Sequence, residues 1–140
     1  WRKGNSALLK EQLYSESGKT LAEFVNSSTM YSEAILMDTK GANVAVFPGT
    51  SDYWQGDEDN FIETYNNGQG KLFVQNLKFD QSTNAFSVDV GLPIRRKGEA
   101  YGEAIGALII GINWVDFAHD ERAKQVIFDL VADELKKKQN

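Results

Sequence analysis

The chain has 140 residues, of which 41% are apolar and 25% are charged, a composition typical of one soluble globular domain with a single core. Lysine and arginine number 15 against 20 aspartates and glutamates, so the formal net charge is −5. This balance argues against nucleic acid and anionic lipid as partners, and we expect a small molecule instead. Cysteine is absent, which excludes disulfides and thiolate chemistry but leaves the cellular compartment open.

No apolar run reaches the ~18 residues that a membrane-spanning helix needs. The longest run, residues 104–112, is interrupted by glycines and is short enough for a central strand. The sequence starts at Trp1 and lacks the charged start and apolar stretch of a signal peptide. We therefore expect a processed or excised piece, with a membrane anchor outside these residues.

The first predicted element is a long helix. Residues 7–25 carry apolar side chains three and four positions apart with polar ones between them, as on one face of an amphipathic helix. Residues 26–29 are Asn, Ser, Ser and Thr, whose side chains compete for backbone hydrogen bonds. The helix should therefore end there.

A hairpin is predicted next. Residues 33–37 and 44–47 have the composition of strands, and residues 38–41 form the turn between them, with Gly41 free to adopt a positive φ. A Pro-Gly pair stops the second strand, because proline cannot donate a hydrogen bond to a neighbouring strand. The chain then enters the irregular, aromatic and acidic stretch TSDYWQGDEDNF, residues 50–61.

A short helix should begin at Asp57. Residues 57–59 are all acidic and would lie at the positive end of the helix dipole, where Asp57 can cap the free amides. The apolar stripe of this helix consists of Phe61, Ile62 and Tyr65. Residues 66–70, rich in Asn and Gly, should end it.

The second half of the chain predicts three strands and a helix. Residues 72–79, 86–94 and 103–114 should form a meander, because polar turns separate them. A final helix is predicted from apolar residues at helical spacing: Phe117, Ala118, Ala123, Val126, Ile127, Leu130, Val131 and Leu135. The prediction is one α+β domain over residues 1–140, a five-stranded antiparallel PAS-like sheet packed by a long N-terminal helix, a short helix between strands two and three, and a C-terminal helix.

Four segments in this order resemble the extracytoplasmic Cache-type sensor domains of bacterial chemoreceptors, sensor kinases and cyclase receptors. They are MDTKGANVAV, TSDYWQGDEDNF, FSVDVGLPI and GEAIGALIIGINW. The resemblance implies a periplasmic or extracytoplasmic module of an inner-membrane receptor, without a cofactor. It also implies binding of a small metabolite, such as an amino acid, amine or carboxylate, in a pocket between the sheet and the long loop.

The sequence departs from this pattern at its end. Membrane-anchored members usually continue promptly from the last strand into a transmembrane helix, whereas a polar-ended amphipathic helix of about five turns is predicted here. Either the anchor lies elsewhere or the chain is a free-standing periplasmic binder of the same fold.

Three aromatic residues are candidates for the ligand pocket. Tyr53, Trp54 and Tyr65 could stack on a ligand and offer a phenol or indole proton, or they could instead anchor the loop to the core. Ser51 belongs to the same loop segment, and Asp57 could face a cationic ligand. We predict that this set faces Asp89 across a pocket.

Asp89 lies mid-strand on the face opposite Val88 and Val90, together with Gly91. It could pair with a ligand ammonium, with Gly91 leaving room beside it, or it could lie on a solvated face. From the preceding strand, either Gln75 or the pair Asn76 and Lys78 would add polar contacts, depending on the register. We assign Gln75 to the candidate site.

No metal site and no enzymatic activity are predicted. The acidic loop lacks the known spacing of a calcium site, and helix capping accounts for most of its charge. His119 is the only histidine, and no nucleophile elbow, phosphate loop or dinucleotide-binding turn is present. The basic run at 95–97 is expected at a solvated hairpin tip, the alternative being a receptor for a ligand carboxylate.

Two classes of function remain. The first is ligand sensing, with the conformational change passing to the terminal helices. The second is a protein-interaction scaffold resembling roadblock or longin modules, without a small-molecule ligand. Sensing requires an internal pocket, whereas a scaffold requires a filled core and an apolar outer surface. A homodimer through the N-terminal helix is compatible with either.

Overall fold

The computed structural model describes residues 6–50, 52–80, 85–122, 124–126, 128–129, 132 and 136. Its helices are α1 (Ser6–Tyr14), α2 (Glu16–Asn26), α3 (Asp59–Tyr65) and α4 (Trp114–His119), with a short 3-10 helix at Asn66–Gly68. Its strands are β1 (Tyr31–Met37), β2 (Asn43–Phe47), β3 (Phe73–Val74), β4 (Lys78–Asp80), β5 (Ala85–Arg95) and β6 (Ala104–Asn113). Among the described residues, no helix is long and apolar enough to cross a bilayer.

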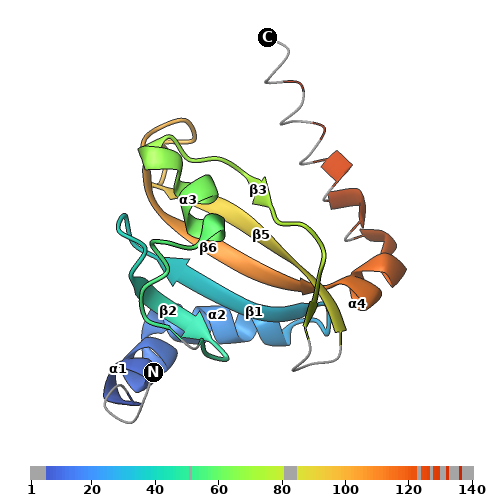
Figure 1. The fold of residues 1–140 in the computed structure, drawn as a ribbon, viewed down its shortest axis with the longest axis horizontal. Coiled ribbons are helices and arrows are strands. Elements are labelled where there is room, and N and C mark those ends of the chain that lie inside the picture. Colours follow the sequence, from blue (N-terminus) through green and yellow to red (C-terminus); the bar gives the residue numbers. More distant parts are fainter. Residues whose placement is uncertain are drawn as a thin grey trace.

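The strands form one antiparallel sheet in the order β2-β1-β6-β5-β3, with β4 also paired to β5 (Figure 1). The predicted hairpin is confirmed as β1 and β2, and Gly41 in its turn has φ +79°. The meander of the second half is confirmed as well. The first and last of the long strands, β1 and β6, meet in the middle of the sheet.

The predicted single strand over residues 72–79 is wrong in one respect. Val74 of β3 pairs with Val90, and Lys78 of β4 pairs with Ser87. Between these two pairs, the segment that joins β3 to β4 therefore has one more residue than β5. One extra residue on one strand of an antiparallel pair is a β-bulge, and it shifts the alternation of side chains by one. The sheet therefore has six strands in five positions.

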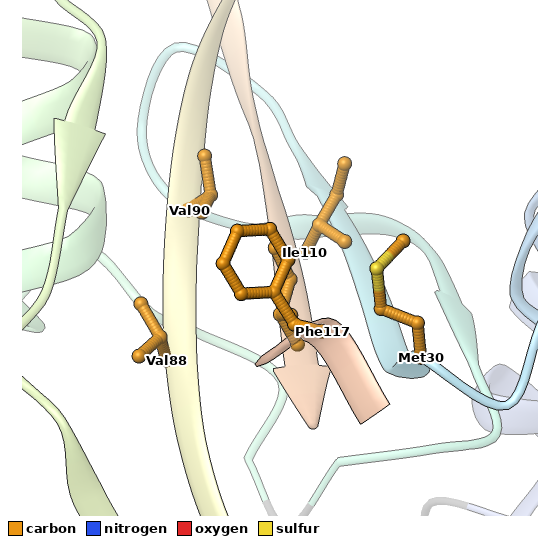
Figure 2. Close-up of a cluster of buried hydrophobic side chains, with 6 residues drawn as sticks. Met30, Val88, Val90, Ile110 and Phe117 are labelled. Atoms are coloured by element: carbon orange, nitrogen blue, oxygen red, sulfur yellow. The ribbon is translucent and has the colours of Figure 1, made fainter. Parts of the chain in front are cut away.

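Helix α2 covers one face of the sheet, where Leu21 and Val25 pack with Ala34 and Ala45. On the same face, β5, β6 and α4 enclose a second cluster (Figure 2). Its buried members are Met30, Val88, Val90, Ile110, Ile112 and Phe117. The predicted apolar face of β5 is thus part of the core.

Helix α3 lies over the opposite face (Figure 1). Phe61 packs there with buried side chains of β1, β2 and β6, to which α1 adds Leu9 and Leu13 at the β2 side. Thr64, fully buried, approaches the backbone of β5 at Gly91. Glycine permits this approach, because a methyl group at position 91 would lie 1.8 Å from Thr64 Oγ1.

The prediction of one long N-terminal helix is wrong, because the chain breaks at Ser15. The Ser15 hydroxyl accepts a hydrogen bond from the Gly18 amide at 3.0 Å and so caps the start of α2. A side chain at Gly18 would lie 2.0 Å from the Gln12 carbonyl oxygen, so glycine lets α1 pack closely against α2. The predicted end of the helix, at residues 26–29, is confirmed.

The C-terminal helix also differs from the prediction. It starts at Trp114, within the range predicted for the last strand, because Asn113 Oδ1 accepts hydrogen bonds from the backbone amides of Val115 and Asp116. It is interrupted at Asp120, whose φ and ψ are −100° and 101°, and helical backbone recurs at 121–122, 124–126, 128–129, 132 and 136. Five members of the predicted apolar stripe lie outside the described residues: Ala123, Ile127, Leu130, Val131 and Leu135.

Candidate functional site

A polar cavity of about 200 Å³ lies between α3, the loop before it and the sheet. Its apolar lining consists of Ile35, Met37, Phe61 and Ile109. Its polar lining consists of Glu33, Thr50, Gln55, Glu58, Asn60, Gln75, Lys78 and Asp89. Strands β1, β4, β5 and β6 supply one wall, and α3 and its preceding loop supply the other.

Asp89 is a half-buried carboxylate of this cavity. Asn60, on α3, donates a hydrogen bond from Nδ2 to Asp89 Oδ2 at 2.9 Å. Burial raises the pKa of Asp89, while the Asn60 hydrogen bond and the positive charge of Lys78 act in the opposite direction. Within the described part of the chain, Asn60 Oδ1 is buried and has no hydrogen-bond partner, so α3 presents an unpaired acceptor near this carboxylate.

Two carboxylates of the cavity share one row of the sheet. Glu33 on β1 is paired with Gly111 on β6, and Gly111 is paired in turn with Asp89 on β5. Side chains paired across an antiparallel sheet point to the same face. The row therefore consists of an acid, a glycine and an acid. The space over the glycine is filled, because a methyl group at Gly111 would lie 2.5 Å from Ser32 Oγ and 2.8 Å from Glu33 Cγ.

Two of the predicted site residues, Asp89 and Gln75, line this cavity together. The backbone amide of Gln75 also donates to the backbone carbonyl oxygen of Asp89 at 2.9 Å, which continues the pairing of β3 with β5. Lys78, considered only as the alternative to Gln75, lines the cavity too. Strict alternation cannot bring positions 75 and 78 to one face, but the bulge between β3 and β4 does.

Tyr53 and Trp54 lie elsewhere, on the side of the loop next to the β1–β2 turn. Trp54 donates from its indole nitrogen to the Lys40 carbonyl oxygen at 2.7 Å, and Tyr53 accepts at its carbonyl oxygen from the Asn43 amide at 3.0 Å. Neither lines the cavity beside Asp89. The prediction that they face Asp89 is therefore wrong, and they fasten the loop to the hairpin.

Of the three remaining predicted site residues, Tyr65 and Asp57 also lie outside the lining of the cavity. Tyr65 stacks on Phe61 at a centroid distance of 5.3 Å and packs against the core. Asp57 is exposed, and the capping predicted for it is wrong, because the N-cap of α3 is Glu58, whose side chain makes no capping hydrogen bond. Ser51 lies outside the described residues.

Sequence reasoning missed Glu33, Glu58 and Asn60 as lining residues. For Glu33 a signal existed, because it shares the alternation of Ile35 and Met37 on β1 and so lies on the same face of the sheet. The position of Asn60 over Asp89 depends on where α3 lies on the sheet. No local sequence pattern predicts where a helix packs on a sheet.

The basic run contributes differently from the prediction. Arg95 is not at a solvated hairpin tip: its guanidinium donates to the carbonyl oxygens of Gln69 at 2.9 Å and Gly70 at 3.2 Å, and also to that of Gly102. It ties the segment after α3 to the β5–β6 hairpin. As for metals, the described residues include no group of three or more His, Asp or Glu side chains that could hold an ion.

Solved structures supply the comparison, because no family profile and no curated protein matches the sequence. One similar structure is the ligand-binding domain of the Pseudomonas aeruginosa amino-acid chemoreceptor PctC in complex with GABA. Its TM-score is 0.53 at 16% identity, over 92% of this chain and 54% of that one. The fold is that of a bacterial extracellular ligand-binding domain.

Two further structures agree. The ligand-binding domain of the Campylobacter jejuni chemoreceptor Tlp3, in complex with 4-methylisoleucine, has a TM-score of 0.50 at 16% identity, over 76% of this chain and 47% of that one. An extracellular ligand-binding receptor from Desulfohalobium retbaense has a TM-score of 0.51 at 17% identity, over 81% of this chain and 22% of that one. The chain thus spans about half or less of these proteins. The resemblance to Cache-type sensor domains is confirmed at the level of the fold, and these neighbours are receptor domains, not enzymes.

Proposed function

We propose that residues 1–140 are one extracytoplasmic sensor domain that binds a small metabolite, of the amino acid, amine or carboxylate class, in the cavity between α3 and the sheet. The observation that carries the proposal is the half-buried Asp89, held by Asn60 inside a cavity whose lining is mainly polar. A carboxylate in such a place is costly to leave unpaired, and a ligand that donates to it would offset that cost.

The two walls of the cavity belong to different parts of the fold, which suits a sensor. Asn60 and Glu58 lie at the start of α3, whereas Asp89 lies on β5. A ligand that contacts both would change the position of α3 relative to the sheet. On the other face of β5, Val88 and Val90 pack against Phe117 of α4 (Figure 2), so a shift of β5 would reach the C-terminal helix.

The test is a thermal-shift screen with amino acids, aliphatic amines and carboxylates. A ligand at 100 times its Kd stabilises the folded state by about 2.7 kcal/mol, since it binds that state only. With an unfolding entropy of about 2.1 cal/mol/K per residue, this corresponds to a rise in Tm of roughly 9 °C. Asp89→Ala should abolish the rise, and Asp57→Ala, which removes an exposed carboxylate outside the cavity, should keep it. A screen in which no compound raises Tm contradicts the proposal.

An interaction scaffold is the second candidate, favoured by apolar side chains that remain exposed on the α4 side of the sheet edge. Phe79 and Phe86, in edge-to-face contact at 5.2 Å, are 50% and 46% exposed, and Val74 and Trp114 are 46% and 41% exposed. Exposed apolar patches often mark protein interfaces. Light scattering of the wild type and of Phe79→Ser/Phe86→Ser separates the candidates: a scaffold that dimerises through this patch becomes monomeric, whereas a sensor keeps its ligand response.

We further propose that the membrane anchor lies in flanking sequence and that homodimerisation uses the N-terminal helices. The flanking gene sequence tests the first point, since an anchored receptor requires an apolar span of about 20 residues on at least one side. For the second, a crosslink between cysteines introduced at the exposed Tyr14 of two copies would support the dimer, and its absence in a dimeric sample would exclude this arrangement.

A further inference from the structure

A second cavity, of about 460 Å³, lies on the face of the sheet opposite Asp89, and we call it the apolar cavity. Its floor consists of Val90 and Leu92 of β5 and of Ile110 and Ile112 of β6. The end of α2 forms one side, and α4 with the segment after it forms the other. Neither α2 nor α4 contributes to the lining of the polar cavity, so the two cavities are separate.

The size and the lining of the apolar cavity fit an aliphatic chain. Its volume falls within the ~300–1,000 Å³ of small-molecule sites and equals roughly 15 waters at ~30 Å³ each. Met30 and Phe117 border it together with the apolar floor (Figure 2). Water gains few hydrogen bonds in such a lining, whereas each methylene group that leaves water for it is stabilised.

The mouth of the apolar cavity offers donors. Arg122, after α4, is exposed there, and within the described residues it forms no hydrogen bond or ion pair. Ser28 Oγ accepts a backbone amide at 3.2 Å, and its own proton has no acceptor among these residues. Two acceptors at the mouth are already engaged: the Phe24 carbonyl oxygen receives the amide and the hydroxyl of Ser27, and Asp120 has a partner as well. This balance favours a ligand carboxylate over a ligand ammonium.

We propose that the apolar cavity is a second ligand site, and that it takes an unbranched aliphatic monocarboxylate of about six to ten carbons. The chain lies on the floor formed by β5 and β6, and the carboxylate lies at the mouth between Arg122 and Ser28. The bound molecule thereby joins the end of α2 to the segment after α4. This goes beyond the proposed sensor function, because the two sites lie on opposite faces of the sheet and differ in ligand.

A series of straight-chain probes tests the ligand class by isothermal titration calorimetry on the 140-residue chain. The probes are butanoate, hexanoate, octanoate, 1-octanol and 1-aminooctane, each below the concentration at which it forms micelles. We expect one octanoate per chain, and affinity that rises about fourfold with each methylene from butanoate to octanoate. 1-Octanol should bind more weakly than octanoate, and 1-aminooctane more weakly still. If octanoate does not bind, or if 1-aminooctane binds more tightly, the second site is overturned, while the thermal-shift test of the polar cavity is unaffected.

Two pairs of variants test the placement. Leu92→Trp fills the cavity and should abolish octanoate binding, whereas Ile105→Trp adds the same side chain to β6 outside the cavity and should not. Arg122→Gln should weaken octanoate about two- to fivefold, as expected for an exposed ion pair, and leave 1-octanol unchanged. Its control is Lys124→Gln, since the ion pair of Lys124 with Glu121 lies outside the cavity.

Circular dichroism checks that each variant is folded. Unchanged octanoate affinity in folded Leu92→Trp would overturn the site. Should Leu92→Trp not fold, the Arg122→Gln pair decides, and an equal effect on octanoate and 1-octanol would overturn the proposal.

Discussion

The contact between α3 and β5 at Gly91 offers a sharp test of how the cavity is framed. At Gly91 an added methyl group would lie 1.8 Å from Thr64 Oγ1 and 3.0 Å from Thr64 Cβ, and both residues are buried. A carbon and an oxygen that are not bonded need more than ~3 Å, so the contact in Gly91→Ala must open by more than about 1 Å. Since Thr64 belongs to the helix, either its side chain or α3 as a whole has to move.

The expected cost follows from overpacking a filled contact, about 1–3 kcal/mol. The unfolding entropy of a 140-residue chain is roughly 0.3 kcal/mol/K, so Tm should fall by about 3–10 °C. Thermal unfolding followed by circular dichroism measures the change in Tm, and urea unfolding gives the change in free energy. Movement of α3 also displaces Asn60 from Asp89, so ligand binding should weaken in the same variant.

Thr64→Ala supplies the internal control through a double-mutant cycle. It removes the hydroxyl that the new methyl group would strike, and within the described residues this hydroxyl has no hydrogen-bond partner to lose. The double variant should therefore be more stable than the sum of the single effects by about 1 kcal/mol or more. If Gly91→Ala melts within 1 °C of the wild type, or if the two effects simply add, α3 does not lie on β5 at this point and the cavity is framed differently.

Three further predictions concern single contacts. Arg95→Ala should lower the unfolding free energy by about 1.5–3 kcal/mol in urea titrations, because it removes the charged donor to the carbonyl oxygens of Gln69 and Gly70. An unchanged urea midpoint would contradict a stabilising role for these hydrogen bonds. Ser15→Ala should cost about 1 kcal/mol, the value of an N-cap, and Ser15→Asn should recover most of it. Burial raises the pKa of Asp89, so the folded state binds this proton more tightly than the unfolded chain, and the unfolding free energy should fall as pH rises from the ordinary aspartate pKa to the raised one. Asp89→Asn should flatten that segment of the pH profile, and a profile identical to the wild type would refute it.

The sequence by itself determined the class of fold, because local patterns carry that information. Strand composition identified β1 and β2, alternation of apolar residues identified β5, and a short apolar run identified β6. The Asn-Ser-rich stretch correctly ended α2, and Gly41 marked the hairpin turn. Each of these depends on residues close together in the chain, whose period or backbone preference is visible without any tertiary contact. The alternation along β5 also placed Asp89 on the face opposite Val88 and Val90, which is the face that α3 covers.

Tertiary structure decided which residues meet Asp89. The bulge between β3 and β4 brought Gln75 and Lys78 to one face, although strict alternation had made them alternatives. The break at Ser15 and the fastening of Trp54 to Lys40 are likewise results of packing, which overrides helical periodicity and residue type.

The acidic row illustrates the physical reason most directly. Glu33 and Asp89 are far apart in the chain. They lie in one row of the sheet only because both pair with Gly111 on β6. Sheet register is a property of long-range pairing, and a shift of one residue would turn either side chain to the other face. The sequence therefore determined that β5 carries a carboxylate on the face opposite Val88 and Val90, and only the pairing of three strands decided that a second carboxylate lies in the same row, across Gly111 from it.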